Sequence, residues 1–209
     1  MVEQGTPEWM SMRLGKATAS RMADITAKTK TGWGASRANY MAQIVAERLT
    51  GVPAESYSSP AMQWGSATEP EARAAYEFYS GRAVALIDFV DHPTIAMSGA
   101  SPDGLVGDCG LIEIKCPNTA THIETLLGEA IPEKYLKQMH WQMACTGRAW
   151  CDFVSYDPRM PEDLRLFVKR VTTVSGVVAE LEDHVRVFLK EVDAKVSALN
   201  ALRQAEAAE

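Results

Sequence analysis

"SPDGLVGDCGLIEIKCP", residues 101–117, contains two short apolar runs on either side of a turn-forming Gly-Asp-Cys segment. If residues 107–109 form a three-residue hairpin loop, strand pairing is centred on Asp108, and Asp103 falls directly opposite Glu113. Opposed side chains in such a ladder have Cβ atoms roughly 4.5–5.5 Å apart. Lys115 lies two residues beyond Glu113 and therefore on the same face of its strand. The stretch thus predicts a β-hairpin that brings two acids and a lysine together.

Two carboxylates that face each other destabilise a hairpin unless positive charge lies between them. Lys115 offsets this repulsion only in part, whereas a divalent cation offsets it fully, and carboxylate, water and phosphate oxygens are the ligands that Mg²⁺ prefers. Such an ion polarises a phosphodiester and lowers the pKa of bound water, and Lys115 can orient or deprotonate the attacking water. The spacing Asp-x9-Glu-x-Lys therefore indicates phosphodiester hydrolysis. A surface hairpin with an ordinary Glu/Lys pair is the alternative that spacing alone leaves open.

Around this hairpin, the centre of the chain has strand-like patterns and both flanks have helical ones. Short apolar and β-branched runs separated by turn formers predict strands, which we expect to build one central sheet, at 84–90, 94–97, 103–106, 111–116, 149–156 and 164–171. Capping residues and apolar periodicity predict helices at 6–15, from near 20, at 36–51, at 132–147 and from about 175 into the tail.

Two segments are less regular. Residues 60–80 are predicted to form two helical pieces broken near Gly65 and Pro70, and residues 28–36 a polar loop that leads to Ser36 as a helix N-cap. The pattern contains no repeat and no linker. It predicts a single α/β domain over residues 1–209, with a central mixed β-sheet flanked by helices.

Composition and charge narrow the class of protein. The formal net charge of −6 argues against a protein that coats nucleic acid by charge alone. Residues 52–161 hold fourteen acids against seven Lys/Arg, so negative charge is concentrated around the hairpin. No window reaches the roughly 18 apolar residues of a membrane span, and the start of the chain has no signal-peptide pattern, so we expect a soluble cytoplasmic protein. The four cysteines lack zinc-finger or Cys-x-x-Cys spacing and are expected to be reduced thiols.

Pro102-Asp103 followed by Glu113-Ile114-Lys115 resembles the PD-(D/E)XK nuclease pattern. Further stretches occur in the order and rough spacing of the phage lambda-type exonuclease, or YqaJ-like viral recombinase, family: "WMSMRLGKATAS", "WGSATEPEAR", "ASPDGL", "LIEIKCP", "YLKQMHWQM" and "YDPRM". The resemblance covers roughly residues 5–160. Several separated motifs that agree in order make a chance match improbable.

The resemblance implies an activity. Enzymes of this family are Mg²⁺-dependent 5′→3′ exonucleases that digest one strand of linear double-stranded DNA processively. These enzymes work as ring-shaped homotrimers and release 5′-mononucleotides. They leave 3′ single-stranded tails for a single-strand annealing recombination protein. For this chain the resemblance therefore implies two Mg²⁺ ions, for which Mn²⁺ can substitute, and a place in the cytoplasm of a bacterial host as a phage or prophage product. No membrane partner is implied.

The resemblance also implies site residues. The metal ligands would be the carboxylates of Asp103, Glu113 and Glu69 and the main-chain carbonyl of Ile114, with Lys115 as the catalytic lysine. Gln138 resembles the helical glutamine that the wider superfamily places beside the metal. Without the resemblance, the preferred explanation of Glu69 is an acid favoured by a helix N-terminus beside Pro70, and Gln138 is explained as a half-exposed polar residue of an amphipathic helix.

A second group corresponds to the family's pocket for a terminal 5′-phosphate, formed by Arg13, Ser20 and Ser101, with Trp9 positioned to stack on terminal bases. From the residues alone, an exposed helix arginine, an N-cap serine and a core tryptophan explain the same positions. The pattern departs from the family where a further arginine is expected, because Thr121 stands there, followed by His122. Two rival functions stay open: a related PD-(D/E)XK endonuclease and a non-catalytic module that binds DNA ends.

Overall fold

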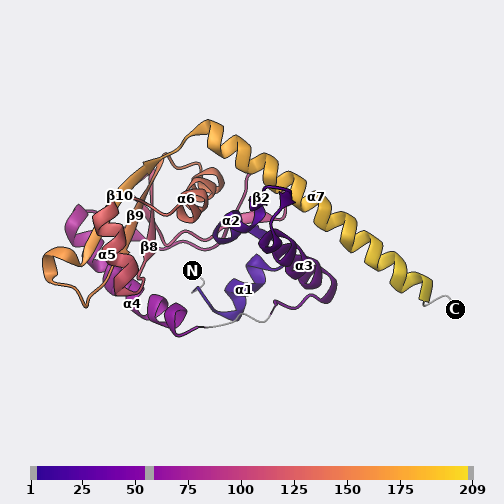
Figure 1. Cartoon of the computed structure of the whole chain (residues 1–209), viewed down its shortest axis with the longest axis horizontal. Helices are drawn as coiled ribbons and strands as arrows, with labels where there is room; N and C mark the ends of the chain where they lie inside the picture. Colours follow the sequence, from indigo (N-terminus) through magenta and orange to yellow (C-terminus); the bar gives the residue numbers. More distant parts are fainter. Residues whose placement is uncertain (1–3, 55–58, 207–209) are drawn as a thin grey trace.

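The computed structural model describes residues 4–54 and 59–206, and its largest sheet is a five-stranded mixed sheet. Strands β8, β9 and β10 of this sheet are labelled on the left of Figure 1. The strand order is β10-β9-β8-β7-β4. The strands are β4 (Val84–Ala85), β7 (Gly104–Val106), β8 (Gly110–Lys115), β9 (Trp150–Tyr156) and β10 (Leu166–Thr172). Helices cover both faces of this sheet, so the predicted α/β class is confirmed.

The hairpin β7–β8 has the predicted register. Its pairs are Gly104↔Ile112, Leu105↔Leu111 and Val106↔Gly110, which centre the turn on Asp108. Gly107, in the turn, has φ +55°, a left-handed conformation that favours glycine. Regular pairing of β7 with β8 begins at Gly104, the residue after Asp103. The Asp103 carboxylate therefore lies just outside the ladder, at the position where it would face Glu113.

Strand β8 pairs in parallel with β9, and a parallel pair requires a long crossover connection. Two helices form it, α5 (Thr119–Gly128) and α6 (Glu133–Thr146). Helix α6 was predicted, whereas α5 was not. The sequence "NTATHIE" has weak apolar periodicity, but Asn118 caps the helix by accepting a hydrogen bond from the Thr121 amide at 2.9 Å.

The two faces of the sheet have separate apolar clusters. On one face, Val106, Ile112 and Ile114 pack with Ala72 and Tyr76 of α4 (Pro60–Ser80). On the other face, the cluster joins α6 to β8 and β9 through Leu111, Met139, Met143, Cys151 and Phe153. Because side chains alternate along a strand, Glu113 and Lys115 share the α6 face with Leu111.

Helix α4 corrects a prediction, because it runs without interruption through Gly65 and Pro70. A proline inside a helix costs about 3 kcal/mol relative to alanine. Beyond Pro70, however, Ala72 and Tyr76 are completely buried against the sheet, and the Tyr76 hydroxyl donates to Asp152 at 2.8 Å. Burying one such large side chain contributes about 1.5–3 kcal/mol, so packing keeps the helix continuous.

The predicted central sheet is present, but the expectation that the runs 84–90 and 94–97 belong to it is wrong in part. Among the described residues there are two smaller sheets, β1-β6-β5 and the hairpin β2–β3. They are formed by β1 (Ala17–Thr18), β5 (Val90–Asp91), β6 (Ser98–Ala100), β2 (Lys28–Thr29) and β3 (Gly32–Trp33). The run 84–90 is divided between two sheets. Residues 94–97 form a turn rather than a strand, because the Ser98 hydroxyl donates back to the Ile95 carbonyl and Met97 has φ +58°.

A third cluster lies beside the β1-β6-β5 sheet and includes side chains of η1 (Ala19–Arg21), α2 (Met22–Ile25), α3 (Ala35–Thr50) and α7 (Ser175–Glu206). Helix α1 (Pro7–Arg13) contributes no buried residue, and the short helix η2 (Glu162–Leu164) lies between β9 and β10 in the chain. Thr6 caps α1, and Gly51 ends α3 in a left-handed conformation, as predicted. The N-cap of α3 is Gly34 rather than Ser36, because the segment before it folds into the β2–β3 hairpin instead of an open loop.

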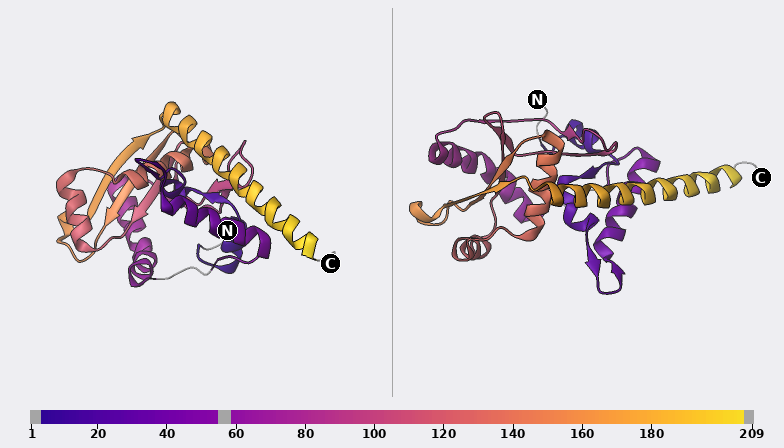
Figure 2. Two further views of the ribbon diagram at one scale, coloured as in Figure 1. Left: turned by 45° about the vertical axis from the view of Figure 1, so that its right-hand side comes forward. Right: turned by 90° about the horizontal axis from the view of Figure 1, so that it is seen from above.

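Helix α7 begins at the sheet and runs along α3, and its last turns extend beyond the rest of the chain (Figure 2). Leu181, Val185 and Phe188 anchor its first half in the core. In the part of the chain that the structure describes, no helix has both the length and the apolar content of a membrane span.

Candidate active site

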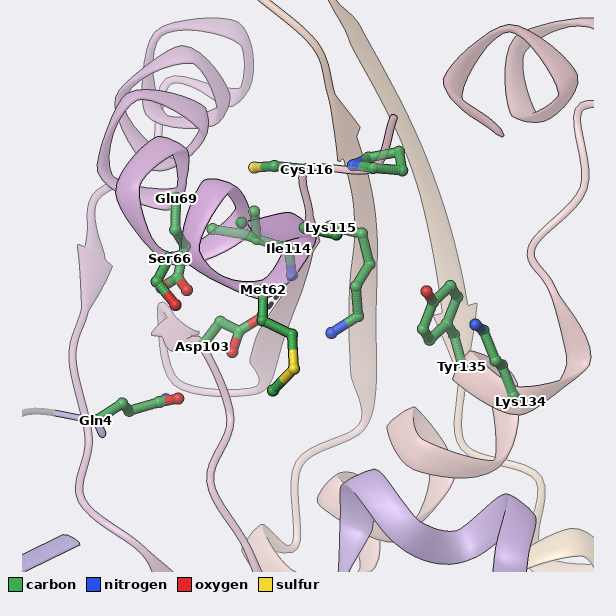
Figure 3. A pocket seen from close by; sticks show the side chains of 13 residues that line it. Gln4, Met62, Ser66, Glu69, Asp103, Ile114, Lys115, Cys116, Lys134 and Tyr135 are labelled. Carbon is green, nitrogen blue, oxygen red and sulfur yellow. Dashed lines mark hydrogen bonds between the residues drawn. The ribbon is translucent and has the colours of Figure 1, made fainter. Parts of the chain in front are cut away.

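A cavity of about 570 Å³ lies where β8 ends, between α4 and the first turn of α6. Figure 3 shows Glu69 of α4 on one side and Tyr135 of α6 on the other, with Asp103 and Lys115 between them. The last two residues of β8, Ile114 and Lys115, line the cavity together with Cys116 and Pro117, which follow the strand. Three elements that are far apart in the sequence therefore meet at one opening.

Asp103 is nearly inaccessible to solvent, and its Oδ2 accepts a hydrogen bond from the Ile114 amide at 2.7 Å. Burial raises the pKa of Asp103 well above its usual range. The charges of Glu113 and Glu69 raise this pKa further, and Lys115 opposes them. The protein therefore keeps a carboxyl group here against both desolvation and like-charge repulsion.

Glu113 is fully buried, and each of its oxygens accepts a hydrogen bond. Gln138 Nε2 donates to Oε1 at 2.7 Å, and Gln142 Nε2 donates to Oε2 at 2.6 Å. Lys115 Nζ forms an ion pair with Oε1. Sequence reasoning identified Gln138 but missed Gln142. The signal was present, because glutamines four residues apart on one helix face the same neighbour.

Lys115 faces the same carboxylates. Its burial lowers the pKa of the ammonium group, but Glu113 and Asp103 raise it more, so the pKa of Lys115 lies above its ordinary value. Lys115 Nζ lies 5.2 Å from the ring centroid of Tyr135, which stacks on Phe153 at 5.6 Å. At neutral pH this lysine is therefore a fixed positive charge on the cavity wall.

Glu69 approaches from the opposite side, on α4. It pairs with Arg73 one turn later, and burial raises its pKa. Arg73 and Lys115 oppose that increase, and Glu113 adds to it. The charge of Glu113 raises the pKa of both Glu69 and Asp103, and the charge of Glu69 raises the pKa of Asp103. The three acids come from separate segments but interact electrostatically.

We tested whether these residues fit a divalent cation. Within residues 4–54 and 59–206, no three His, Cys, Asp or Glu side chains lie close enough together to hold an ion by themselves. Mg²⁺, however, is usually bound by one or two carboxylates together with water and phosphate oxygens. Asp103, Glu69 and the Ile114 segment line the cavity with hard oxygen atoms. The pKa values of Asp103 and Glu69 are raised by burial and, to a lesser extent, by like-charge repulsion, and a bound cation would oppose both effects. The residues present therefore fit such an ion.

The predicted phosphate-binding residues also meet. Arg13 Nη1 donates to Ser101 Oγ at 3.1 Å and Nη2 to Ser20 Oγ at 3.2 Å, and Trp9 Nε1 also donates to Ser101 Oγ at 3.1 Å. The guanidinium carbon of Arg13 lies 4.1 Å from the Trp9 ring centroid, which is cation–π distance. Sequence reasoning missed Thr18, whose hydroxyl accepts from Arg13 Nη2 at 3.3 Å.

Ser101 links the two groups of residues, because it lies two positions before Asp103. Ser20 does not act as an N-cap: it lies inside η1, whose N-cap Thr18 makes no side-chain capping bond, and its hydroxyl accepts from Arg13 instead. Burial lowers the pKa of Arg13, although an arginine stays charged at any pH of interest. The cluster is thus one partly buried cation surrounded by hydroxyl groups.

Thr121 and His122 occupy the place where the family resemblance leads us to expect a further arginine. Thr121 lies in the first turn of α5, and the His122 ring is completely buried. Its Nδ1 lies 2.7 Å from Ser155 Oγ and its Nε2 2.9 Å from the Leu164 carbonyl oxygen. Because both ring nitrogens have partners inside the protein, His122 fixes α5 to the sheet and does not replace an arginine.

The "YDPRM" stretch forms a corner that holds the cavity walls together. The Tyr156 hydroxyl donates to Glu71 of α4 at 2.8 Å, and Arg159 Nη2 donates to the Pro117 carbonyl at 3.1 Å. Burial would raise the pKa of Asp157, but hydrogen bonds from Arg159 and Thr119 lower it to about 2. The corner therefore connects α4, the end of β8 and the start of α5.

Comparisons with known proteins agree with this arrangement. The family model described as YqaJ-like viral recombinase domain matches residues 8–149. The crystal structure of an alkaline exonuclease (LHK-Exo) from Laribacter hongkongensis has 51% sequence identity and a TM-score of 0.89, covering 98% of this chain and 100% of that one. The same enzyme in complex with dAMP gives a TM-score of 0.90 at the same identity and coverage.

A more distant structure supports the fold alone. The phage related exonuclease from Haemophilus somnus 129PT has 15% identity and a TM-score of 0.73, over 88% of this chain and 96% of that one. Comparison with curated protein sequences gives no match.

Proposed function

Because the chain belongs to the YqaJ-like viral recombinase domain family, we propose that it is a DNA exonuclease that removes nucleotides from the 5′ end of one strand of linear duplex DNA. The products are 5′-mononucleotides and 3′ single-stranded tails. The observation that carries the proposal is the cavity where Asp103 and Glu69 face each other beside Lys115, with buried Glu113 behind them. The 51% identity to an alkaline exonuclease over nearly the whole chain supports the exonuclease activity in this proposal.

Each residue of the cavity has a role that its surroundings suit. Asp103, Glu113, Glu69 and the Ile114 carbonyl would hold Mg²⁺, or Mn²⁺ in its place, with Glu113 as the most deeply buried of the carboxylates, and we propose two ions. A bound divalent ion of this kind would supply Lewis acidity towards the scissile phosphate and a more acidic water. Lys115, as an ammonium, orients that water and counters negative charge that develops on the phosphate. Gln138 holds the Glu113 carboxylate in place.

We name Arg13 and the hydroxyl-bearing residues around it the Arg13 cluster. This cluster would bind the DNA end at which digestion starts. One guanidinium with the hydroxyls of Ser20, Ser101 and Thr18 around it offers several donors to a terminal phosphate. Ser101 lies two residues before Asp103, so a 5′-phosphate held here stays close to the hydrolytic cavity. Trp9, stacked against Arg13, presents an aromatic surface for a terminal base.

The decisive experiment is digestion of linear duplexes labelled at the 5′ or the 3′ end, with and without Mg²⁺. We expect labelled mononucleotide to appear first from the 5′-labelled strand and only when the metal is present. A covalently closed circle should resist digestion until it is linearised. Cleavage of the intact circle would instead indicate an endonuclease, and binding of ends without nucleotide release would indicate a non-catalytic module.

Replacing Arg13 should weaken recognition of the 5′-phosphate more than catalysis. In Arg13→Gln the fixed charge is lost while hydrogen-bonding capacity remains, so the rate on 5′-phosphorylated ends should fall about tenfold, as expected for a charge-assisted hydrogen bond. The rate on 5′-hydroxyl ends should change little. Arg21→Gln is a matched control, because Arg21 pairs with Asp24 and Gln43 rather than with Ser20 or Ser101. Equal losses on both kinds of end would contradict the assignment.

We further propose that the enzyme acts as a homotrimer that encircles DNA and passes its 3′ tails to a single-strand annealing recombination protein in the bacterial cytoplasm. A net charge of −6 gives a single chain little long-range attraction to DNA, so encirclement supplies the processivity that charge does not. Light scattering should give three times the chain mass of 22.9 kDa. A monomer at micromolar concentration would contradict the ring.

A further inference from the structure

Gln142 is a completely buried polar side chain next to the candidate active site, yet it does not line the cavity. It lies one helical turn after Gln138 on α6, and its Nε2 is 2.6 Å from Glu113 Oε2. Gln138 and Gln142 therefore hold the two oxygens of one carboxylate from two successive turns of the same helix.

The lone pairs of Glu113 show why the second glutamine matters. Each carboxylate oxygen has two lone pairs. Oε1 accepts from both Gln138 and Lys115, whereas among the described residues only Gln142 donates to Oε2. Without Gln142 the carboxylate would be held at one oxygen and could turn about its terminal bond. One lone pair of Oε2 remains open for a further ligand.

An amide is suited to this position because it is neutral. A lysine or arginine donor would compete with a metal ion for the negative charge of Glu113, while an amide fixes the oxygen and leaves the charge in place. The Cys151 thiol, 4.0 Å from Gln142 Oε1, lies on the oxygen side of the amide. A flipped amide would place its own oxygen against the carboxylate, so this arrangement favours the donating orientation.

We propose that Gln142 is a positioning residue that locks the buried Glu113 carboxylate in the orientation needed to support a divalent cation and the phosphate attached to it. The inference rests on the proposed nuclease function, but it concerns a residue that does not touch substrate. Metal-ligating carboxylates commonly depend on such hydrogen-bond partners, and their removal costs about 10–100-fold in metal affinity or activity.

The test compares Gln142→Met with Gln43→Met in the full-length protein. Methionine has nearly the same length as glutamine but no donor. Gln43 is a matched control, because its Nε2 donates at 2.9 Å to Glu47, another buried glutamate four residues away on its helix, outside the cavity. We expect Gln142→Met to bind Mn²⁺ about 10–100-fold more weakly by titration calorimetry without DNA, and kcat to fall similarly with KM for duplex ends nearly unchanged. Gln43→Met should match the wild type in both measurements.

A second variant guards against loss of folding. Gln142→Asn keeps the amide but withdraws it by one methylene, so it should show the same weakening of Mn²⁺ binding even if Gln142→Met unfolds. Mn²⁺ affinity equal to the wild type in a folded Gln142→Met or Gln142→Asn protein would overturn the proposal. Because calorimetry needs no DNA, an inactive wild type that still binds Mn²⁺ would reject the nuclease function while leaving the role of Gln142 testable.

Discussion

Asp103→Asn is expected to reduce nucleotide release about 10³-fold or more while making the metal-free protein more stable at pH 8. The loss follows from removing a charged oxygen ligand whose contribution to transition-state stabilisation is several kcal/mol. The gain follows because the carboxylate is buried and lies in the field of Glu113 and Glu69. Asparagine can still accept the Ile114 amide hydrogen bond through its oxygen.

The gain in stability has a defined pH dependence. The folded-state pKa of Asp103 lies above its unfolded value near 3.8, so the folded protein binds a proton more tightly than the unfolded chain does. The stability that Asp103 contributes is therefore present at low pH and is lost as pH rises from the ordinary carboxyl range through the raised pKa. The melting temperatures of the variant and the wild type should converge near pH 4 and separate at higher pH.

Asp108→Asn is the matched control, because Asp108 is an exposed carboxylate at the tip of the same hairpin. It should leave both activity and the melting curve unchanged. Saturating Mg²⁺ should stabilise the wild type but not Asp103→Asn, since binding to the folded state alone raises stability. If the Asp103→Asn protein retains activity within tenfold of the wild type, the Asp103 carboxylate takes no essential part in the reaction.

Lys115→Met is expected to lower kcat about 10²–10⁴-fold, the range typical of a positioned acid–base group. Unlike Asp103→Asn, it should make the metal-free protein less stable. Methionine keeps most of the length of the side chain but removes the positive charge that Glu113 and Asp103 share, so the metal-free protein should melt at a lower temperature than the wild type. Mn²⁺ should bind as tightly as to the wild type or more tightly, because a competing positive charge is gone.

The matched control is Lys137→Met, since Lys137 is a lysine of α6 that pairs with the exposed Glu133. Its activity, melting temperature and Mn²⁺ affinity should stay at wild-type values. Weaker Mn²⁺ binding by Lys115→Met than by the wild type would show that the lysine supports the metal site rather than the reacting water. Together, the two variants separate metal binding from chemistry.

The parts of the fold that could be predicted from sequence are those set by local geometry. The register of the β7–β8 hairpin follows from a glycine-containing three-residue turn, and it brings Asp103 towards Glu113 without reference to the rest of the chain. The ends of α3 and α6 follow from Gly51 and Gly147, both in left-handed conformations. These features depend on residues within one or two turns of each other.

The errors occur where distant packing overrides local preference. Pro70 predicted a break in α4, but Tyr76 and Ala72 bury against the sheet and keep the helix intact. Gln142 and Thr18 were missed because a glutamine on an amphipathic helix and a threonine in a short strand acquire meaning only from Glu113 and Arg13, which lie 29 and 5 residues away. The contact of Arg13 with Ser101 was inferable only through family resemblance.

Because α7 is long, its far end is a suitable attachment point for a label or tether. Its 32 residues correspond to about 48 Å of helix, and Figure 1 shows its far end on the opposite side of the chain from α4, α5 and β8. A dye, a biotin or a bead linker fused after this helix would therefore sit remote from the hydrolytic centre. Tethering through it suits single-molecule recordings in which the enzyme stays anchored to glass while shortening DNA is followed in real time.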